Sequence, residues 1–188
     1  MLTVSVLAQD FDKNISTARV SYSSGHLQDS RFAMEQILRD LDIAIGKEVL
    51  KLLPTKIGAL TYLEKEDNVT GTGAYTGLYV NRNYGADAKR GTIEIINNSP
   101  LINSLNAILS MPVIGGMVRD ENQKIVRVQG YKAILNKSVN SETGKTNYDL
   151  QIPMNNTLLT LRIDDSSESE ITNVANSIAL AKIVQVAQ

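Results

Sequence analysis

The sequence predicts an α+β fold in which an N-terminal helical hairpin is followed by an antiparallel sheet covered by helices. Apolar residues recur with helical spacing between residues 13 and 53, whereas short β-prone runs separated by turn residues dominate from residue 55 onward. Strands that follow one another through short turns pair antiparallel. We therefore divide the chain into residues 1–8, a helical hairpin over 9–54 and an antiparallel α+β domain over 55–188.

The hairpin is predicted as two helices with a turn at Gly25. The first covers residues 13–24, and glycine readily takes the left-handed conformation that ends a helix. The second begins near Asp29 and ends before Pro54. Apolar residues three or four positions apart form one face of this second helix, which we expect to be buried: Met34, Leu38, Leu41, Ile45, Val49 and Leu52.

Strands and turns alternate through the rest of the chain. Strands are expected within 57–64, 74–83, 91–97, 125–136, 148–152 and 157–163, with a turn-rich stretch over 64–73 and a hairpin turn at 141–144. Ser99-Pro100 opens a helix over 101–110, whose apolar face is Leu101, Leu105, Ile108 and Leu109. A C-terminal helix opens with the capping box Ser167–Glu170 and presents Ile171, Val174, Ile178, Ala181 and Val184 to the sheet.

The stretch Ser21–Asp42 resembles one tetratricopeptide-type helix–turn–helix repeat, although Ser30 stands where that family favours alanine. The matching residues are Tyr22, Gly25, Leu27, Leu38 and Asp42. The sequence holds one such copy, and these repeats bury their faces by stacking on neighbours. The stacking argument favours a plain helical hairpin that packs on the rest of the chain, and a functional repeat is the alternative.

The element order after residue 57 is similar to that of PsbP-like domains, which have an antiparallel sheet flanked by helices. It also resembles uncharacterised exported bacterial proteins that join a helical hairpin to such a sheet. The resemblance covers residues 57–186 and rests on element order. It implies an accessory or binding role, because that fold is commonly non-catalytic.

Residues 1–8 carry the localisation signal. The run MLTVSVLAQ is apolar and uncharged and precedes a polar stretch from Asp10 to Lys13, the pattern found near the cleavage site of a secretory leader. We expect the tail of a leader that is cleaved after Ala8, and hence a bacterial protein exported to the periplasm. A short first β-strand is the alternative. No apolar run of about 18 residues is present, so no transmembrane helix is expected.

Composition excludes several kinds of chemistry. The chain has no cysteine, which excludes disulfides, thiolate nucleophiles and zinc–thiolate sites. His26 is the single histidine and lies in a predicted turn, so neither a histidine-rich metal site nor a Ser-His-Asp triad is expected. A net charge of -1 argues against nucleic-acid binding. We predict a protein that is not an enzyme and holds no cofactor or metal.

Two loops have compositions that could indicate a ligand site, one for calcium and one for phosphate. Asp164, Asp165, Glu168 and Glu170 form the densest acidic patch, but their spacing does not fit a calcium-binding EF-hand, and acids favour a helix N-terminus electrostatically. The glycines between Gly71 and Gly77 precede a predicted strand rather than a helix, which argues against a phosphate loop. We interpret both loops as structural.

An apolar loop between residues 111 and 117 is the candidate binding site, with Met111, Val113, Ile114 and Met117 as its binding residues. Exposed apolar patches mark interaction sites, here for another envelope protein, while burial beneath the sheet is the alternative. The sequence therefore predicts a non-catalytic binding or accessory module. A small-ligand or lipid-contacting carrier with a pocket between sheet and helices is the second hypothesis, and a hydrolase the third.

Overall fold

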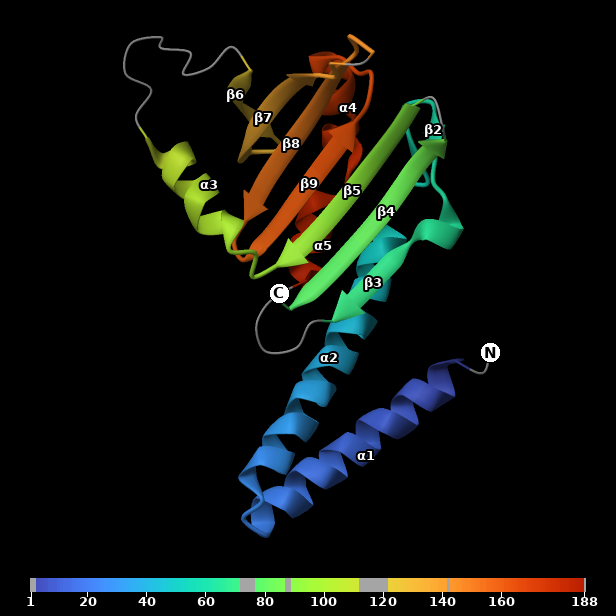
Figure 1. Cartoon of the computed structure of the whole chain (residues 1–188), viewed down its shortest axis with the longest axis vertical. Coiled ribbons are helices and arrows are strands. Elements are labelled where there is room, and N and C mark those ends of the chain that lie inside the picture. Colours follow the sequence, from blue (N-terminus) through green and yellow to red (C-terminus); the bar gives the residue numbers. More distant parts are fainter. Residues whose placement is uncertain (1–2, 72–76, 87–88, 112–121, 142, 188) are drawn as a thin grey trace.

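The computed structural model describes residues 3–71, 77–86, 89–111, 122–141 and 143–187 (Figure 1). Two long helices, α1 (Thr3–Ser23) and α2 (Leu27–Leu52), form the hairpin. Short pieces follow: β1 (Lys56–Ile57), β2 (Leu60–Thr61) and a 3-10 turn, η1 (Glu64–Glu66). The remaining elements are β3 (Asn68–Gly71), β4 (Leu78–Ala86), β5 (Lys89–Asn97), α3 (Leu101–Ser110), β6 (Gln123–Val128), β7 (Tyr131–Val139), β8 (Thr146–Met154), β9 (Thr157–Ile163), α4 (Glu168–Ser177) and α5 (Leu180–Ala187).

Seven strands form one antiparallel sheet in the order β3-β4-β5-β9-β8-β7-β6, and β1 pairs with β2 in a small second sheet. The large sheet consists of two meanders, β3–β5 and β6–β9, joined where β9 pairs with β5. The α+β architecture with an N-terminal helical hairpin is thus confirmed. Among the described helices, none has the length and apolar character needed to cross a bilayer.

One face of the sheet is covered by α4, α5 and the C-terminal part of α2 (Figure 1). Alternate strand residues point into this layer, as period-two side-chain alternation requires. The core strands contribute fully buried side chains: Leu78, Val80, Ile93, Ile95, Leu150, Ile152, Leu159 and Leu161. Each such side chain stabilises the fold by about 1.5–3 kcal/mol relative to leaving it in water.

Helix α3 covers part of the opposite face and forms a second apolar cluster there. Ile102, Leu105 and Leu109 pack on Ile134 and Leu158. The predicted apolar face of this helix is wrong at Leu101, which is 53% exposed, because Ile102 is the buried residue at that end. The spacing of three and four from Ile102 gives the same period with a slightly rotated face.

The N-terminal helix is longer than the sequence indicates. α1 begins at Thr3 rather than at residue 13 and is continuous through Ala8 and Gln9, so the alternative of a first β-strand is wrong. It ends close to Gly25, which has a φ of 79° as predicted for a helix-ending glycine. The hairpin also shares the core of the sheet, since Val49 and Leu53 belong to the main buried cluster.

Three predicted elements are each split in the structure. The strand expected over 57–64 is the short β1–β2 pair, and the turn-rich stretch that follows it contains β3. The strand expected over 125–136 is the hairpin β6–β7, with a turn at Gln129-Gly130 where both residues have positive φ. The C-terminal helix is broken into α4 and α5 at Ile178, which has extended backbone. The last two breaks meet in space, because the Gln129 amide donates to the carbonyl of Ile178 at 2.7 Å and to that of Ala175 at 3.3 Å. This side chain supplies the donor that the end of α4 lacks.

Tyr84 points into the core from β4, is fully buried and donates its hydroxyl to the carbonyl of Pro54 at 2.8 Å. Burial raises the pKa of the Tyr84 phenol well above its ordinary value, because the charged form would be desolvated. The folded state therefore keeps a proton that the unfolded chain releases near pH 10. The stabilising contribution of this group is complete below that pH and is lost as the pH rises above it.

We expect the free energy of unfolding to fall by about 1 kcal/mol more between pH 9 and pH 11 in the wild type than in Tyr84→Phe. At pH 7 the variant is less stable by about 1 kcal/mol, because the Pro54 carbonyl loses its donor. Urea unfolding followed by circular dichroism at each pH measures both quantities. Parallel pH profiles for the two proteins would contradict the assignment.

Candidate interaction surface

The two long helices form an arm that projects from one end of the sheet (Figure 1). We define the arm as α1 together with residues 27–41 of α2, and the root as residues 42–52 of α2. The root packs on β3, β4 and α5, whereas the arm consists of two helices packed on each other and touches the sheet where Arg39 meets Gly71 of β3. At about 1.5 Å per residue the arm portion of α2 is about 22 Å long.

Small residues hold the two arm helices together near the turn. Ala18 and Ala33 are buried between the helices, and so is Ser30, whose hydroxyl donates to the carbonyl of Ala18 at 2.9 Å. Ser30, the position at which the chain departs from the tetratricopeptide pattern, thus makes the polar contact of this crossing. Small side chains let the backbones approach closely but bury little apolar area.

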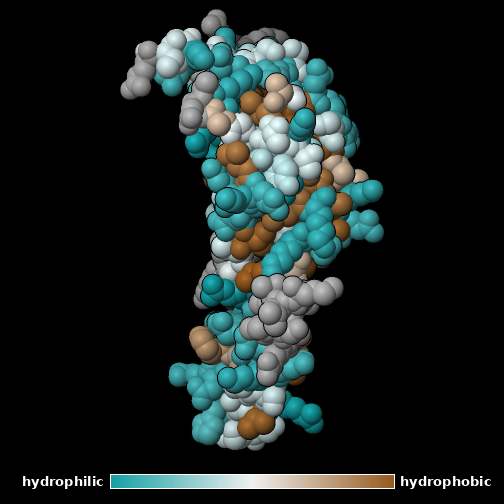
Figure 2. Space-filling view, turned by 90° about the vertical axis from the view of Figure 1, so that its right-hand side faces the viewer, coloured by the Kyte–Doolittle hydropathy of each residue, from teal (hydrophilic) through white to brown (hydrophobic). Residues whose placement is uncertain are grey.

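The larger apolar side chains of the arm are exposed. Of the twelve large hydrophobic residues that are 44% or more exposed in the described chain, eight lie on the arm. The stripe Met34, Leu38 and Leu41, predicted to be core, is 46–49% exposed, and burial along α2 begins at the root, where Val49 is fully enclosed. In Figure 2 the arm is the narrow lower part of the molecule, where hydrophobic residues appear as separate spots on a mostly hydrophilic surface.

Three of these eight residues, Ile15, Tyr22 and Met34, line a groove between the two helices. The groove, which Ala18 and Ile37 also line, has a volume of about 330 Å³. Leu27, Leu38 and Leu41 are seven, four and seven residues from Met34 and so share its face of α2. We name these six residues the arm seam: Ile15, Tyr22, Leu27, Met34, Leu38 and Leu41. The other two, Val20 and Phe32, are each two residues from a seam position, and at about 100° per residue they point to the opposite side of their helices.

The root is held to the sheet by glycines and by a buried ion pair. Gly46 lies so close to the sheet that a Cβ there would meet side chains of Val69 and Leu78, and one at Gly71 would meet the backbone of Arg39. Arg82 is 7% exposed and forks onto Asp67 at 2.9 and 2.5 Å. The same guanidinium donates to the carbonyl of Leu53 at 3.1 Å, just after α2 ends. These contacts fix the direction in which the arm projects.

The loop predicted to bind a partner is only partly described. Met111, at the end of α3, is 44% exposed, while Val113, Ile114 and Met117 lie outside the described residues. The structure therefore leaves the predicted binding loop as a prediction. Its first residue, Met111, caps the C-terminus of α3, and among the described residues eight of the twelve exposed large hydrophobic side chains lie on the arm.

The residues weighed for chemistry are dispersed or engaged with structural partners. His26 is exposed in the hairpin turn, as predicted. Three of the four clustered acids pair with lysines from different parts of the sheet: Glu168 with Lys124, Glu170 with Lys89 and Asp165 with Lys145, at 2.7–2.8 Å. The hydrogen bond from Lys145 lowers the pKa of Asp165. Within the described ranges, no three His, Asp or Glu residues are grouped as metal ligands.

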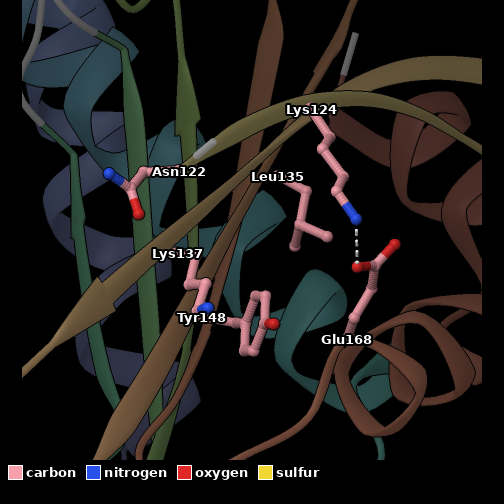
Figure 3. A pocket seen from close by; sticks show the side chains of 6 residues that line it. All are labelled: Asn122, Lys124, Leu135, Lys137, Tyr148 and Glu168. Atoms are coloured by element: carbon pink, nitrogen blue, oxygen red, sulfur yellow. Dashed lines mark hydrogen bonds and ion pairs between the residues drawn. The ribbon is translucent and has the colours of Figure 1, made fainter. Parts of the chain in front are cut away.

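A small polar pocket lies between the sheet and α4 (Figure 3). Lys124 reaches Glu168 across it, and Leu135, Lys137, Tyr148 and Asn122 complete the lining. Its volume is about 100 Å³, whereas pockets for small organic ligands begin at about 300 Å³. The pocket occupies the place that the carrier hypothesis requires, but it is smaller and more polar than a lipid needs.

The face of the sheet that α4 and α5 do not cover carries a polar ladder. Arg162 donates to Asp149 at 2.7 Å and to Glu94 at 3.2 Å, and Asn136 and Gln123 extend the chain of bonds to β6. At the other end of the ladder, the hydroxyl of Tyr79 on β4 donates to Glu94 at 3.4 Å. Burial and that carboxylate raise the pKa of Tyr79. These groups bind one another across six strands, which makes the ladder a structural network.

Comparison with protein-family models, with curated proteins and with solved structures found no match. The arm seam was missed as a site because its periodicity is also that of a core helix. The signal that could have found it is the single repeat-like hairpin, whose faces have no neighbouring repeat to cover them.

Proposed function

We propose that the protein is a non-catalytic, exported binding module that docks onto another polypeptide through the arm seam. The observation that carries this proposal is the exposure of the six seam residues, which ranges from 44% for Ile15 to 67% for Tyr22. Contiguous apolar surface on a soluble chain marks an interaction site. Apolar residues spaced by three and four along a helix are the pattern that helix-in-groove contacts use.

The sheet with α3, α4 and α5, which we call the body, supports a scaffolding role. Its interior is filled by aliphatic side chains, and its charged networks, such as Arg82 with Asp67 and Arg162 with Glu94 and Asp149, bind structural partners. A rigid sheet with a firmly rooted projecting helix is suited to presenting a surface at a fixed angle. Docking at the arm then leaves the fold of the body unchanged.

A photo-crosslinking amino acid at Leu38, installed in the protein at its native level in its own host, tests this function. We expect Leu38 to form a defined adduct with a polypeptide, because the seam is covered by a partner. Val139, which is 58% exposed on β7 and outside the arm, is the matched control and is expected to form none. Equal yields at the two positions, or no adduct at Leu38, would overturn the docking role.

The same sample tests export. N-terminal sequencing of the isolated protein is expected to begin at Gln9 if the leader is removed after Ala8. A chain that still begins at Met1 contradicts cleavage. The chain that starts at Gln9 keeps Ile15 and Tyr22, because both follow the cleavage site in the sequence. Docking and export are therefore decided separately.

A further inference from the structure

We infer that the partner covering the arm seam is the arm of a second copy of this chain, so that two hairpins complete an antiparallel four-helix bundle. This inference rests on the proposed docking function and specifies its partner. A two-helix arm cannot enclose its own apolar side, whereas two such hairpins packed face to face make the core of a bundle. The pairing is isologous, with the same surface on both copies.

The spacing of the seam is that of a helical bundle. On α1, Phe11, Ile15, Ala18 and Tyr22 follow one another by four, three and four residues. On α2, Leu27 and Met34 are seven apart, and Leu38, Leu41 and Ile45 continue by four, three and four. Two heptad-like stripes side by side present knobs and holes to helices with the same repeat. The arm of a second copy has this repeat.

The groove between the helices has the shape that such a contact needs. Side chains from both helices line it, with Ile15 and Tyr22 on α1 and Met34 and Ile37 on α2. The arm projects beyond the sheet, so its outer part is accessible to a second arm (Figure 1). Ala18 and Ser30, which lie at the bottom of the crossing, are buried within one copy and remain so.

The charges of the arm match an antiparallel copy of itself. The described arm carries five acids (Asp10, Asp12, Asp29, Glu35 and Asp40) and four bases (Lys13, Arg19, Arg31 and Arg39). On α1 the acids Asp10 and Asp12 come first and Arg19 lies nearer the turn. A two-fold axis near Ile15 brings Asp12 of one copy beside Arg19 of the other, because Asp12 and Arg19 are seven residues apart and lie on the same face of α1. A strongly acidic or basic partner would meet no such complement.

The size of the seam is sufficient for a specific dimer. Six side chains that are about half exposed bury on the order of 500 Å² of apolar surface per copy, before the polar flanks are counted. A standard interface buries about 800 Å² per partner in total. The seam therefore supplies the apolar centre of an interface, and the charged residues beside it supply the rim.

Analytical ultracentrifugation of the purified full chain is the direct test. We expect a dimer at about 50 μM for the wild type, and a dissociation constant raised by about 100-fold or more in Met34→Glu with Leu38→Glu. Val20→Glu with Phe32→Glu is the matched control, because it places the same charges on the arm but off the seam. This control is expected to stay within about 3-fold of the wild type.

Far-UV circular dichroism and urea unfolding confirm that each variant is folded before its mass is compared. A monomeric wild type at 50 μM, or equal weakening by the seam and control pairs, overturns the second copy as partner. If Leu38 nevertheless forms an adduct with a different polypeptide in the host, the docking function stands while the self-association inference fails. If no adduct forms, both fail.

A charge exchange tests the antiparallel arrangement. Arg19→Glu alone is expected to weaken the dimer by about 10-fold, because Arg19 faces Asp12 of the other copy. Adding Asp12→Lys in the same chain is expected to restore the dissociation constant to within about 3-fold of the wild type. Additive weakening in the double variant would exclude this register.

Discussion

Replacing Arg82 with methionine is expected to lower the free energy of unfolding by about 3–5 kcal/mol. The side chains of Arg82 and Asp67 are only 9% and 13% exposed, and the guanidinium lies over the ring of Tyr62 with 4.6 Å to its centroid. Methionine fills much of the space but leaves the carboxylate of Asp67 and the carbonyl of Leu53 without their donor. A buried charge that loses its partner is strongly destabilising.

A double variant separates two contributions to the free energy of unfolding: the cost of leaving Asp67 buried without a partner, and the net contribution of the Arg82–Asp67 pair. Arg82→Met with Asp67→Leu is expected to recover more than half of the lost stability, because both charges are then gone. Arg31→Met is the surface control: its pair with Glu35 is at 3.1 Å, but Arg31 is 71% exposed, and we expect a change below about 0.5 kcal/mol. Urea unfolding measures all four proteins. A loss at Arg82 no larger than at Arg31 would contradict the buried clamp.

Gly46→Leu is the second large effect, with an expected loss of about 2–3 kcal/mol in the free energy of unfolding. A Cβ at this position would lie 2.6 Å from Leu78 and closer still to Val69, and the rest of a leucine has no space between helix and sheet. The better helix propensity of leucine offsets only about 1 kcal/mol of this. The side chains of β3 and β4 must move, and the root is displaced from the sheet.

Ala44→Leu is the matched control for this substitution, since Ala44 lies on the exposed side of the same helix. We expect its stability to stay within about 0.5 kcal/mol of the wild type. Thermal unfolding of both variants in one buffer gives the comparison. If Gly46→Leu is as stable as Ala44→Leu, close approach of the helix to the sheet is not what requires glycine at this position.

Both substitutions act where the arm meets the body, and this has a functional consequence. The helix is continuous from Leu52 at the root to Leu27 near the turn, so a change in its seat on the sheet redirects the whole arm. The direction in which the arm presents the seam therefore depends on how the root packs on the sheet. Gly46 and Arg82, which lie outside the seam, are therefore positioning residues for the proposed contact.

Much of the fold could be predicted because it depends on local chemistry. Ser167 accepts a hydrogen bond from the amide of Glu170 at 3.1 Å, as the N-terminal capping signal predicts. The glycine near the end of the first helix, the β4–β5 hairpin and the turn near Gly144 also lie where turn residues place them. The breaks at Gln129 and Ile178 could not be predicted, because they are stabilised by each other across 49 positions of the chain.

For the arm seam too, one part could be predicted from local sequence and another depended on contacts distant in the chain. The sequence by itself determined that residues along the second helix form an apolar stripe through Met34, Leu38, Leu41, Ile45, Val49 and Leu52, since period 3.6 is a property of the helix. Only the tertiary structure decided which part of that stripe is core. The sheet encloses Gly46 and Val49, and its edge ends at Gly71 beside the backbone of Arg39, while the side chains of Met34 and Leu38 are about half exposed. Burial depends on what lies opposite a residue in space, and helical periodicity contains no information about where the opposing sheet ends.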